Sequence, residues 1–215
     1  YHEAAIHLKK KTIFTGNPIR KDIQIMDKIQ AKKQFNCTSS KPLLVVLGGS
    51  QGSVPLNHHF QKHYSHYTDS GIQILWQCGK NDYDGLKDSV HNEKIHLMPF
   101  SDDMGALYSA SDLIVSRAGA LALSEMAFMG KAMVLVPFPN SAGDHQVKNA
   151  LTFSNCGAAI VMPQSQLEYG ELENTVLELF KNPEKIQTME EQSIQMAAPD
   201  TTVNIINTIM EIAES

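Results

Sequence analysis

Six short apolar runs, most of them separated by longer amphipathic stretches, constrain the fold of this chain more than any other feature. The runs cover residues 43–47, 72–76, 95–98, 113–116, 133–137 and 159–162. Short, continuously apolar runs between turn residues are typical of strands that are buried on both faces. Helical patterns lie at 56–67, 103–110, 121–129 and 146–155. Repeated strand–helix–strand units predict an α/β fold with a doubly wound parallel sheet of five or six strands.

The two ends of the chain follow other patterns. Residues 13–15 could form a strand, and residues 21–36 are interpreted as a helix or a linker. Beyond Pro163 the pattern becomes helical, with helices expected at 171–181, 184–196 and 201–213. The chain begins with Tyr1 rather than Met, and we expect it to be an excised domain.

Composition excludes several classes of protein. The net charge is −5 and the pI is about 6.0, whereas a general nucleic-acid binder usually has a basic stripe and a pI above about 9. Three cysteines without CxxC spacing disfavour a disulfide scaffold and a structural zinc site, and they fit a reducing cytosol. No apolar run approaches the roughly 18 residues of a membrane span.

The loop after the first run, GGSQGS at residues 48–53, is a candidate anion site. In an open parallel sheet, ligands bind beyond the carboxyl ends of the strands. Glycines allow close approach of the backbone, and free N–H groups at a helix start attract anions. A tight turn without a ligand explains the same residues equally well.

The loop after the fourth run, RAGALALSE at residues 117–125, is a second candidate of the same kind. Glu125, about one turn into the helix, could accept hydrogen bonds from two vicinal hydroxyls, or it could be an ordinary carboxylate near a helix N-terminus. Arg117 stands in an apolar stretch, which indicates either an anionic ligand or a structural ion pair.

Several polar residues have a functional and a structural interpretation. His145 could be a general base, although a loop histidine is more often merely exposed. Asp144 is a natural N-cap, as is Asp102, with Asp103 in the first helical turn. His59 and His63 are four residues apart on one helix, and a solvated polar face is favoured over a metal pair. No metal site is predicted.

Five motifs occur together in a fixed order. They are TGNPIR at 15–20, LGGSQG at 47–52, FSDDM at 100–104, ASDLIVSRAGALALSEM at 110–126 and DHQVKNA at 144–150. From about residue 12 to its end, the chain resembles the C-terminal domain of the MurG family, bacterial peptidoglycan N-acetylglucosaminyltransferases with a GT-B fold. The resemblance implies a Rossmann-like domain that binds UDP-GlcNAc. It also implies transfer of GlcNAc, with inversion, to lipid I, which gives lipid II.

The resemblance also assigns roles to residues. The Ser101 backbone would face the uracil, and Glu125 would hold the ribose hydroxyls. Ser50 and the helix start at 120–123 would hold the diphosphate. Gln146 would reach the GlcNAc hydroxyls, and Arg20 would lie near a hinge. The expected UDP-GlcNAc-binding residues are Arg20, Ser50, Gln51, Ser101, Met104, Gly119, Ala120, Leu121, Ala122, Leu123, Ser124, Glu125, His145, Gln146 and Asn149. No cofactor is implied.

This chain departs from the family at two positions. Ala122 stands where Thr or Ser is common, and Asp144 stands where Asn is common. Both departures imply weaker binding of the donor, or pairing of Asp144 with a cation.

The resemblance also leaves part of the family unmatched. The family's N-terminal domain, with its lipid-acceptor site and membrane-facing patch, has no counterpart here. The catalytic base is therefore expected in that domain, and this fragment alone is expected to be soluble and inactive. The whole enzyme would be peripheral, on the cytoplasmic face of the bacterial inner membrane.

The resemblance divides the chain into three parts. We expect a hinge segment at 1–40, the UDP-GlcNAc-binding domain at 41–200, and a helix at 201–215 that packs back toward the N-terminal domain. Two alternatives are a stand-alone donor subunit of a two-chain UDP-GlcNAc transferase and a non-catalytic nucleotide-binding module.

Overall fold

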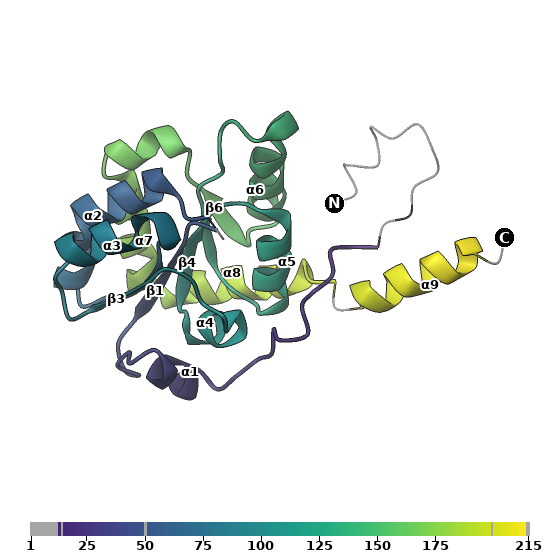
Figure 1. The fold of residues 1–215 in the computed structure, drawn as a ribbon, viewed down its shortest axis with the longest axis horizontal. Coiled ribbons are helices and arrows are strands. Elements are labelled where there is room, and N and C mark those ends of the chain that lie inside the picture. Colours follow the sequence, from purple (N-terminus) through teal and green to yellow (C-terminus); the bar gives the residue numbers. More distant parts are fainter. Residues whose placement is uncertain (1–12, 14, 50, 199, 214–215) are drawn as a thin grey trace.

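A parallel sheet with helices on both faces forms the body of the molecule (Figure 1). The computed structural model describes residues 13, 15–49, 51–198 and 200–213. The sheet has the order β3-β2-β1-β4-β5-β6, and every pairing is parallel. Its strands are β1 Leu43–Leu47, β2 Gln73–Gln77, β3 Ile95–Met98, β4 Leu113–Ser116, β5 Met133–Leu135 and β6 Ala159–Val161. The predicted doubly wound sheet is therefore confirmed, with strand ends shifted by one or two residues at most.

The helices agree with the predicted pattern except in the first half of the chain. They are α1 Lys28–Gln34, α2 Val54–Asp69, α3 Lys80–Ser89, α4 Met104–Ala110, α5 Ala120–Phe128, α6 His145–Asn155, α7 Glu171–Lys181, α8 Pro183–Gln195 and α9 Thr201–Ala213, with short 3₁₀ turns η2 Ala142–Asp144 and η3 Gln164–Glu168. Helix α3 was not predicted, because Gly85 and many charged residues leave it little apolar periodicity. The possible strand at 13–15 is wrong for residues 13 and 15, and residue 14 lies outside the described residues.

Strand β1 separates two cores, and this explains its unbroken apolar run. Leu43, Val45 and Leu47 pack with residues of α4, α5 and α6, whereas Leu44 and Val46 pack with residues of α2, α3 and α7. Successive side chains of a strand point to opposite faces, so a strand covered on both faces shows no polar alternation.

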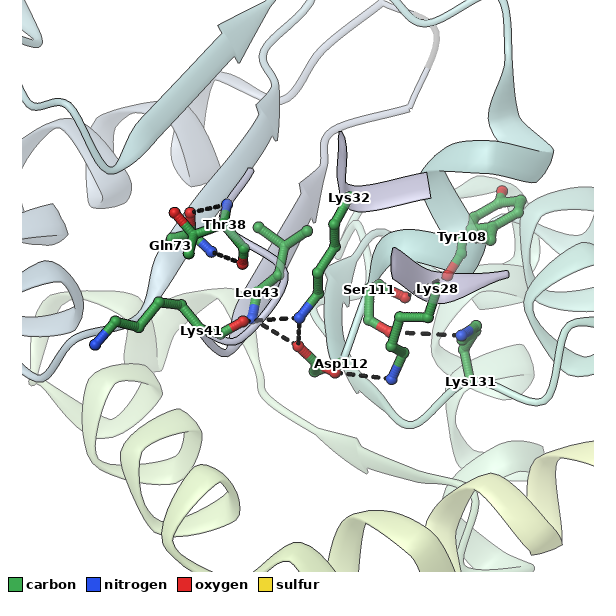
Figure 2. A network of polar contacts seen from close by, with 10 residues as sticks. All are labelled: Lys28, Lys32, Thr38, Lys41, Leu43, Gln73, Tyr108, Ser111, Asp112 and Lys131. Carbon is green, nitrogen blue, oxygen red and sulfur yellow. Dashed lines mark hydrogen bonds and ion pairs between the residues drawn. The ribbon is translucent and has the colours of Figure 1, made fainter. Parts of the chain in front are cut away.

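A polar network fastens α1 to the amino end of the sheet (Figure 2). The Asp112 carboxylate accepts hydrogen bonds from Lys28 Nζ and Lys32 Nζ, both at 2.7 Å, and from the Leu43 N–H at 2.8 Å. Lys32 Nζ also donates to the Lys41 carbonyl at 2.7 Å. Burial opposes ionisation of Asp112, but the bonds from the two lysines hold its pKa below the ordinary value.

The strand order also determines where a ligand can bind. The chain proceeds from β1 to one side of the sheet and from β4 to the other, so the loops that follow these adjacent strands diverge. Such a reversal leaves a crevice beyond the carboxyl ends of the strands. No helix in the described part of the chain is both long and apolar enough to cross a membrane.

Candidate functional site

A cavity of about 650 Å³ occupies this position, and we call it the β1–β4 crevice. The loop after β1, the loop after β4, helix α4 and the segment around residue 20 contribute its walls. Eight of the residues expected from the sequence line it. They are Arg20, Gln51, Met104, Gly119, Leu121, Ala122, Glu125 and Gln146.

The loop after β1 brings glycine backbone to the crevice. Gly49 has a φ of 88°, and apart from its chain neighbours no described residue has an atom within 4 Å of the place where a Cβ would stand. Gly52 has a φ of 80°, and a Cβ there would collide with the Cys78 carbonyl. Both positions therefore require glycine, and at Gly49 the space is open to a ligand.

Two helices begin at the crevice, and the residue before each of them provides no side-chain cap. Ser53 precedes α2 and Gly119 precedes α5, and among the described residues neither helix start has a capping side-chain hydrogen bond. The first N–H groups of a helix have no partner within it, and they carry partial positive charge. In α5 the Leu123 N–H already bonds to the Gly119 carbonyl at 3.0 Å. The free donors at this helix start therefore precede Leu123.

Arg117 is buried in the wall of the crevice and has only neutral partners in the described part of the chain. Its Nε donates to Ser53 Oγ at 3.0 Å, its Nη1 to the Val136 carbonyl at 3.0 Å and its Nη2 to Gln164 Oε1 at 2.7 Å. Burial lowers its pKa. Of the two interpretations left open by the sequence, the structural ion pair is absent among the described residues. A positive charge without a nearby carboxylate favours an anionic ligand.

The Glu125 carboxylate also lines the crevice, and both of its oxygens accept hydrogen bonds. Arg20 Nε donates to Oε1 at 3.0 Å, and the Tyr108 hydroxyl donates to Oε2 at 2.9 Å. Burial, together with the Glu125 charge, raises the pKa of Tyr108, so this hydroxyl remains a donor. A carboxylate oxygen has two lone pairs, so Glu125 can still accept from a ligand.

The partnership between Glu125 and Tyr108 could not be anticipated from the sequence. Tyr108 lies in α4, where a tyrosine among apolar residues is typical of the core. Gln77, which also lines the crevice, did carry a signal, because it is a polar residue at the end of a buried strand.

Other expected residues do not line the crevice. They are Ser101, Ala120, Leu123, Ser124, His145 and Asn149. The Ser101 N–H donates to Gln77 Oε1 at 3.0 Å, and Asn149 Nδ2 donates to the Ala118 carbonyl at 3.1 Å. Ser124 Oγ accepts from Asn17 Nδ2 at 3.0 Å, which fastens the segment before Arg20 to α5. Ser50 lies outside the described residues.

Two of the expected helix caps were wrong. Helix α4 is capped by Asp103, whose Oδ1 accepts from the Ala106 N–H at 2.9 Å, and not by the exposed Asp102. Asp144 precedes α6 but makes no side-chain cap, because its backbone is left-handed with a φ of 57°. Ser141 Oγ instead accepts from the Gln146 N–H at 3.1 Å.

The loop that carries these last residues orients one side-chain amide at the crevice. Exposed His145 has its Nδ1 2.8 Å from the Ala142 carbonyl. Gln146 Oε1 accepts from the Phe138 N–H at 3.0 Å. The amide nitrogen of Gln146 is thereby oriented as a hydrogen-bond donor at the edge of the crevice.

Comparison with known proteins gives consistent matches over most of the chain. Residues 43–205 match the family described as the glycosyltransferase family 28 C-terminal domain. A protein from Cytophaga hutchinsonii named UDP-N-acetylglucosamine–N-acetylmuramyl-(pentapeptide) pyrophosphoryl-undecaprenol N-acetylglucosamine transferase is 41% identical over 204 residues, which are 94% of this chain and 55% of that protein. A protein of the same name from Porphyromonas gingivalis strain W83 is 35% identical over 212 residues, covering 95% and 55%. The chain thus spans about half the length of the curated relatives it matches.

Two solved structures also superpose on most of this chain. The crystal structure of MurG from Acinetobacter baumannii superposes with a TM-score of 0.71 at 26% identity, covering 90% of this chain and 55% of that one. A UDP-GlcNAc 2-epimerase from Neisseria meningitidis, bound to UDP-GlcNAc, superposes with a TM-score of 0.58 at 15% identity, covering 85% and 48%. The second likeness shows a shared fold.

Proposed function

The chain belongs to the glycosyltransferase family 28 C-terminal domain family, and we propose that its β1–β4 crevice binds UDP-GlcNAc as the sugar donor of a GlcNAc transferase. The named relatives transfer N-acetylglucosamine to a pyrophosphoryl-undecaprenol-linked muramyl pentapeptide. On this proposal the whole enzyme converts lipid I into lipid II in peptidoglycan synthesis.

The observation that carries the proposal is the positive charge of Arg117 and of two helix starts around one cavity, which no carboxylate among the described residues pairs with. Buried Arg117 has no carboxylate partner among the described residues, and the uncapped starts of α2 and α5 lie at the same crevice. A diphosphate carries the negative charge that such an arrangement favours, because helix N-termini and a guanidinium both donate to phosphate oxygens. The diphosphate is therefore assigned to the space between the two helix starts.

The remaining parts of the donor fit around this position. Glu125 would accept from the ribose hydroxyls, and Arg20 would balance its charge. Met104 and Phe100, which line the crevice, would supply apolar surface beside the base. The Ser101 N–H is already bonded to Gln77, so recognition of the uracil edge requires either release of this bond or another group. The Gln146 amide would donate to the sugar.

Helix α9 is the part of this chain that we expect to contact the other half of the enzyme. Helix α9 extends away from the body of the molecule (Figure 1). It exposes a series of apolar side chains: Val203, Ile206, Ile209, Met210 and Ile212. We propose that α9 packs against the part of the enzyme that the relatives have and this chain does not match. That part would supply the catalytic base, the lipid I site and contact with the cytoplasmic face of the inner membrane.

A charge placed at the start of α5 tests the assignment of the diphosphate. Leu121 lines the crevice and is 58% exposed in the first turn of α5. Leu121→Asp adds a negative charge that repels a diphosphate but favours the helix start, so the fold should persist. Leu121→Asn is the matched neutral control. We expect Leu121→Asp to bind UDP-GlcNAc at least tenfold more weakly than Leu121→Asn in calorimetry. Equal affinities of the two variants would contradict the assignment.

A further inference from the structure

A second cluster of polar side chains lies between α2 and α7, away from the β1–β4 crevice. His59 and His63 belong to α2, and Glu173 belongs to the first turn of α7. None of the three lines the crevice. The solvated polar face expected for the two histidines is wrong for His59, whose side chain is 1% exposed. Helix α7 and the turn η3 cover it, and the sequence pattern of α2 alone could not reveal this contact.

The distances within the cluster fit a small metal ion. His59 Nε2 lies 3.5 Å from Glu173 Oε2, and His63 Nδ1 lies 3.1 Å from Glu173 Oε1. One ligand atom from each residue falls within 4.8 Å of the other two. Ligand atoms about 2.0–2.1 Å from a tetrahedral zinc ion are separated by roughly 3.3 Å. Each histidine approaches a different oxygen of Glu173 at about this separation, so a small rotation of the side chains would bring one oxygen and both nitrogens around a single ion.

The Glu173 carboxylate is buried without a hydrogen bond. Its side chain is 3% exposed, and neither oxygen accepts a hydrogen bond in the described part of the structure. The contact with His63 is within ion-pairing distance but lacks hydrogen-bond geometry. A buried carboxylate of this kind is costly unless a cation or a proton compensates it.

The orientation of His59 is that of a metal ligand. Its Nδ1 lies 2.8 Å from the Leu167 carbonyl, which can only accept, so Nδ1 carries the proton. Nε2 therefore carries a lone pair, which accepts from the Tyr67 hydroxyl at 3.1 Å. Glu173 Oε2 lies 3.5 Å from the same nitrogen, so a metal ion bound there would take the place of the Tyr67 proton. Metal-bound histidines commonly donate their second ring N–H to a carbonyl in this way.

We propose that His59 Nε2, His63 Nδ1 and the Glu173 carboxylate bind one divalent ion of the zinc type, which links α2 to α7. Two imidazoles and a carboxylate are a ligand set that zinc accepts. His63 is 19% exposed, so the fourth position can be reached by water from its side of the cluster. The role assigned to this ion is structural, and it is independent of donor binding.

Zinc titration of the full 215-residue chain, stripped of metal and carrying no affinity tag, tests this site. We expect one zinc ion to bind and to raise the thermal midpoint, because a ligand that binds only the folded state stabilises it. Glu173→Gln and His63→Gln should each weaken zinc binding at least tenfold. His58→Gln, a change at an exposed histidine of the same helix, should leave zinc binding unchanged.

Two results would overturn the proposal. One is a wild-type chain whose midpoint does not respond to zinc, and the other is an equal response in His63→Gln. Either would mean that Glu173 shares a proton with the histidines instead. Should Glu173→Gln fail to fold, the partly exposed His63 variant still decides the matter. UDP-GlcNAc binding should be the same with and without zinc, so failure of this site and failure of the donor site are distinguishable.

Discussion

Arg20 Nε lies 3.0 Å from Glu125 Oε1, although 105 positions separate the two residues in the chain. The pair joins the segment before α1 to α5 at the wall of the β1–β4 crevice. The Arg20 side chain is 47% exposed and the Glu125 side chain 10% exposed. A buried acid that faces the crevice is thus neutralised by a cation that solvent can reach.

Glu125→Gln should weaken binding of UDP-GlcNAc by about 1–3 kcal/mol, because one acceptor becomes a donor facing a ribose hydroxyl. Binding of a 2′-deoxy donor should be weakened much less by the same substitution, since one of those hydroxyls is already missing. Calorimetry on both ligands and both proteins closes a double-mutant cycle. If the two ligands respond equally, Glu125 does not bind the ribose.

The Arg20–Glu125 pair should contribute little to stability. An ion pair with one partner near half exposure contributes about 0–1 kcal/mol, because solvent screens it. Urea unfolding of Arg20→Gln, Glu125→Gln and the double variant gives the coupling energy. A coupling above about 2 kcal/mol would show that the pair is a structural element of the fold.

Asp112→Asn should destabilise the chain by about 2–4 kcal/mol, because it leaves Lys32 buried without its charged partner. The Lys32 side chain is 4% exposed. Asp88→Asn, at an exposed position of α3, is the control and should change stability by less than about 0.5 kcal/mol. Chemical denaturation measures both changes. If Asp112→Asn changes stability as little as the Asp88→Asn control does, the network in Figure 2 contributes little to stability.

Lys131 should make the free energy of unfolding rise with pH in the alkaline range. Burial, assisted by the charge of Lys28, lowers the pKa of Lys131 from 10.5 to about 8. Between these values the unfolded chain binds more protons than the folded chain, so stability rises with pH. Lys131→Met removes this titration. The difference in unfolding free energy, wild type minus variant, should therefore increase from pH 7.5 to 9.5, and parallel profiles would contradict the assignment.

Donor binding should need no divalent metal. The starts of α2 and α5, together with Arg117, provide the positive charge that a metal would otherwise supply to a diphosphate. Affinity for UDP-GlcNAc with EDTA should stay within tenfold of the value with magnesium. A larger loss on chelation would require a metal at the crevice.

The sequence predicted the sheet because β1 and β4 are buried on both faces and so carry unbroken apolar runs. Once the sheet was predicted, the loops at the carboxyl ends of these strands could be identified as candidate ligand sites. These loops form much of the crevice. Tyr108 could not be predicted in this way, because its hydroxyl reaches Glu125 only in the folded chain, where α4 and α5 belong to the same core. The meeting of Glu173 with His59 likewise depends on how α7 crosses α2, and no local pattern encodes that contact.

Calorimetric titration of the chain with UDP-GlcNAc, UDP-glucose and ADP-glucose tests the central assignment most directly. A crevice that holds the uracil, the ribose, the diphosphate and the GlcNAc should bind UDP-GlcNAc more tightly than UDP-glucose, and ADP-glucose most weakly. The affinity for ADP-glucose should be at least tenfold lower than the affinity for UDP-GlcNAc. Equal binding of all three ligands, or binding of none, would contradict the assignment of this crevice as a UDP-GlcNAc site.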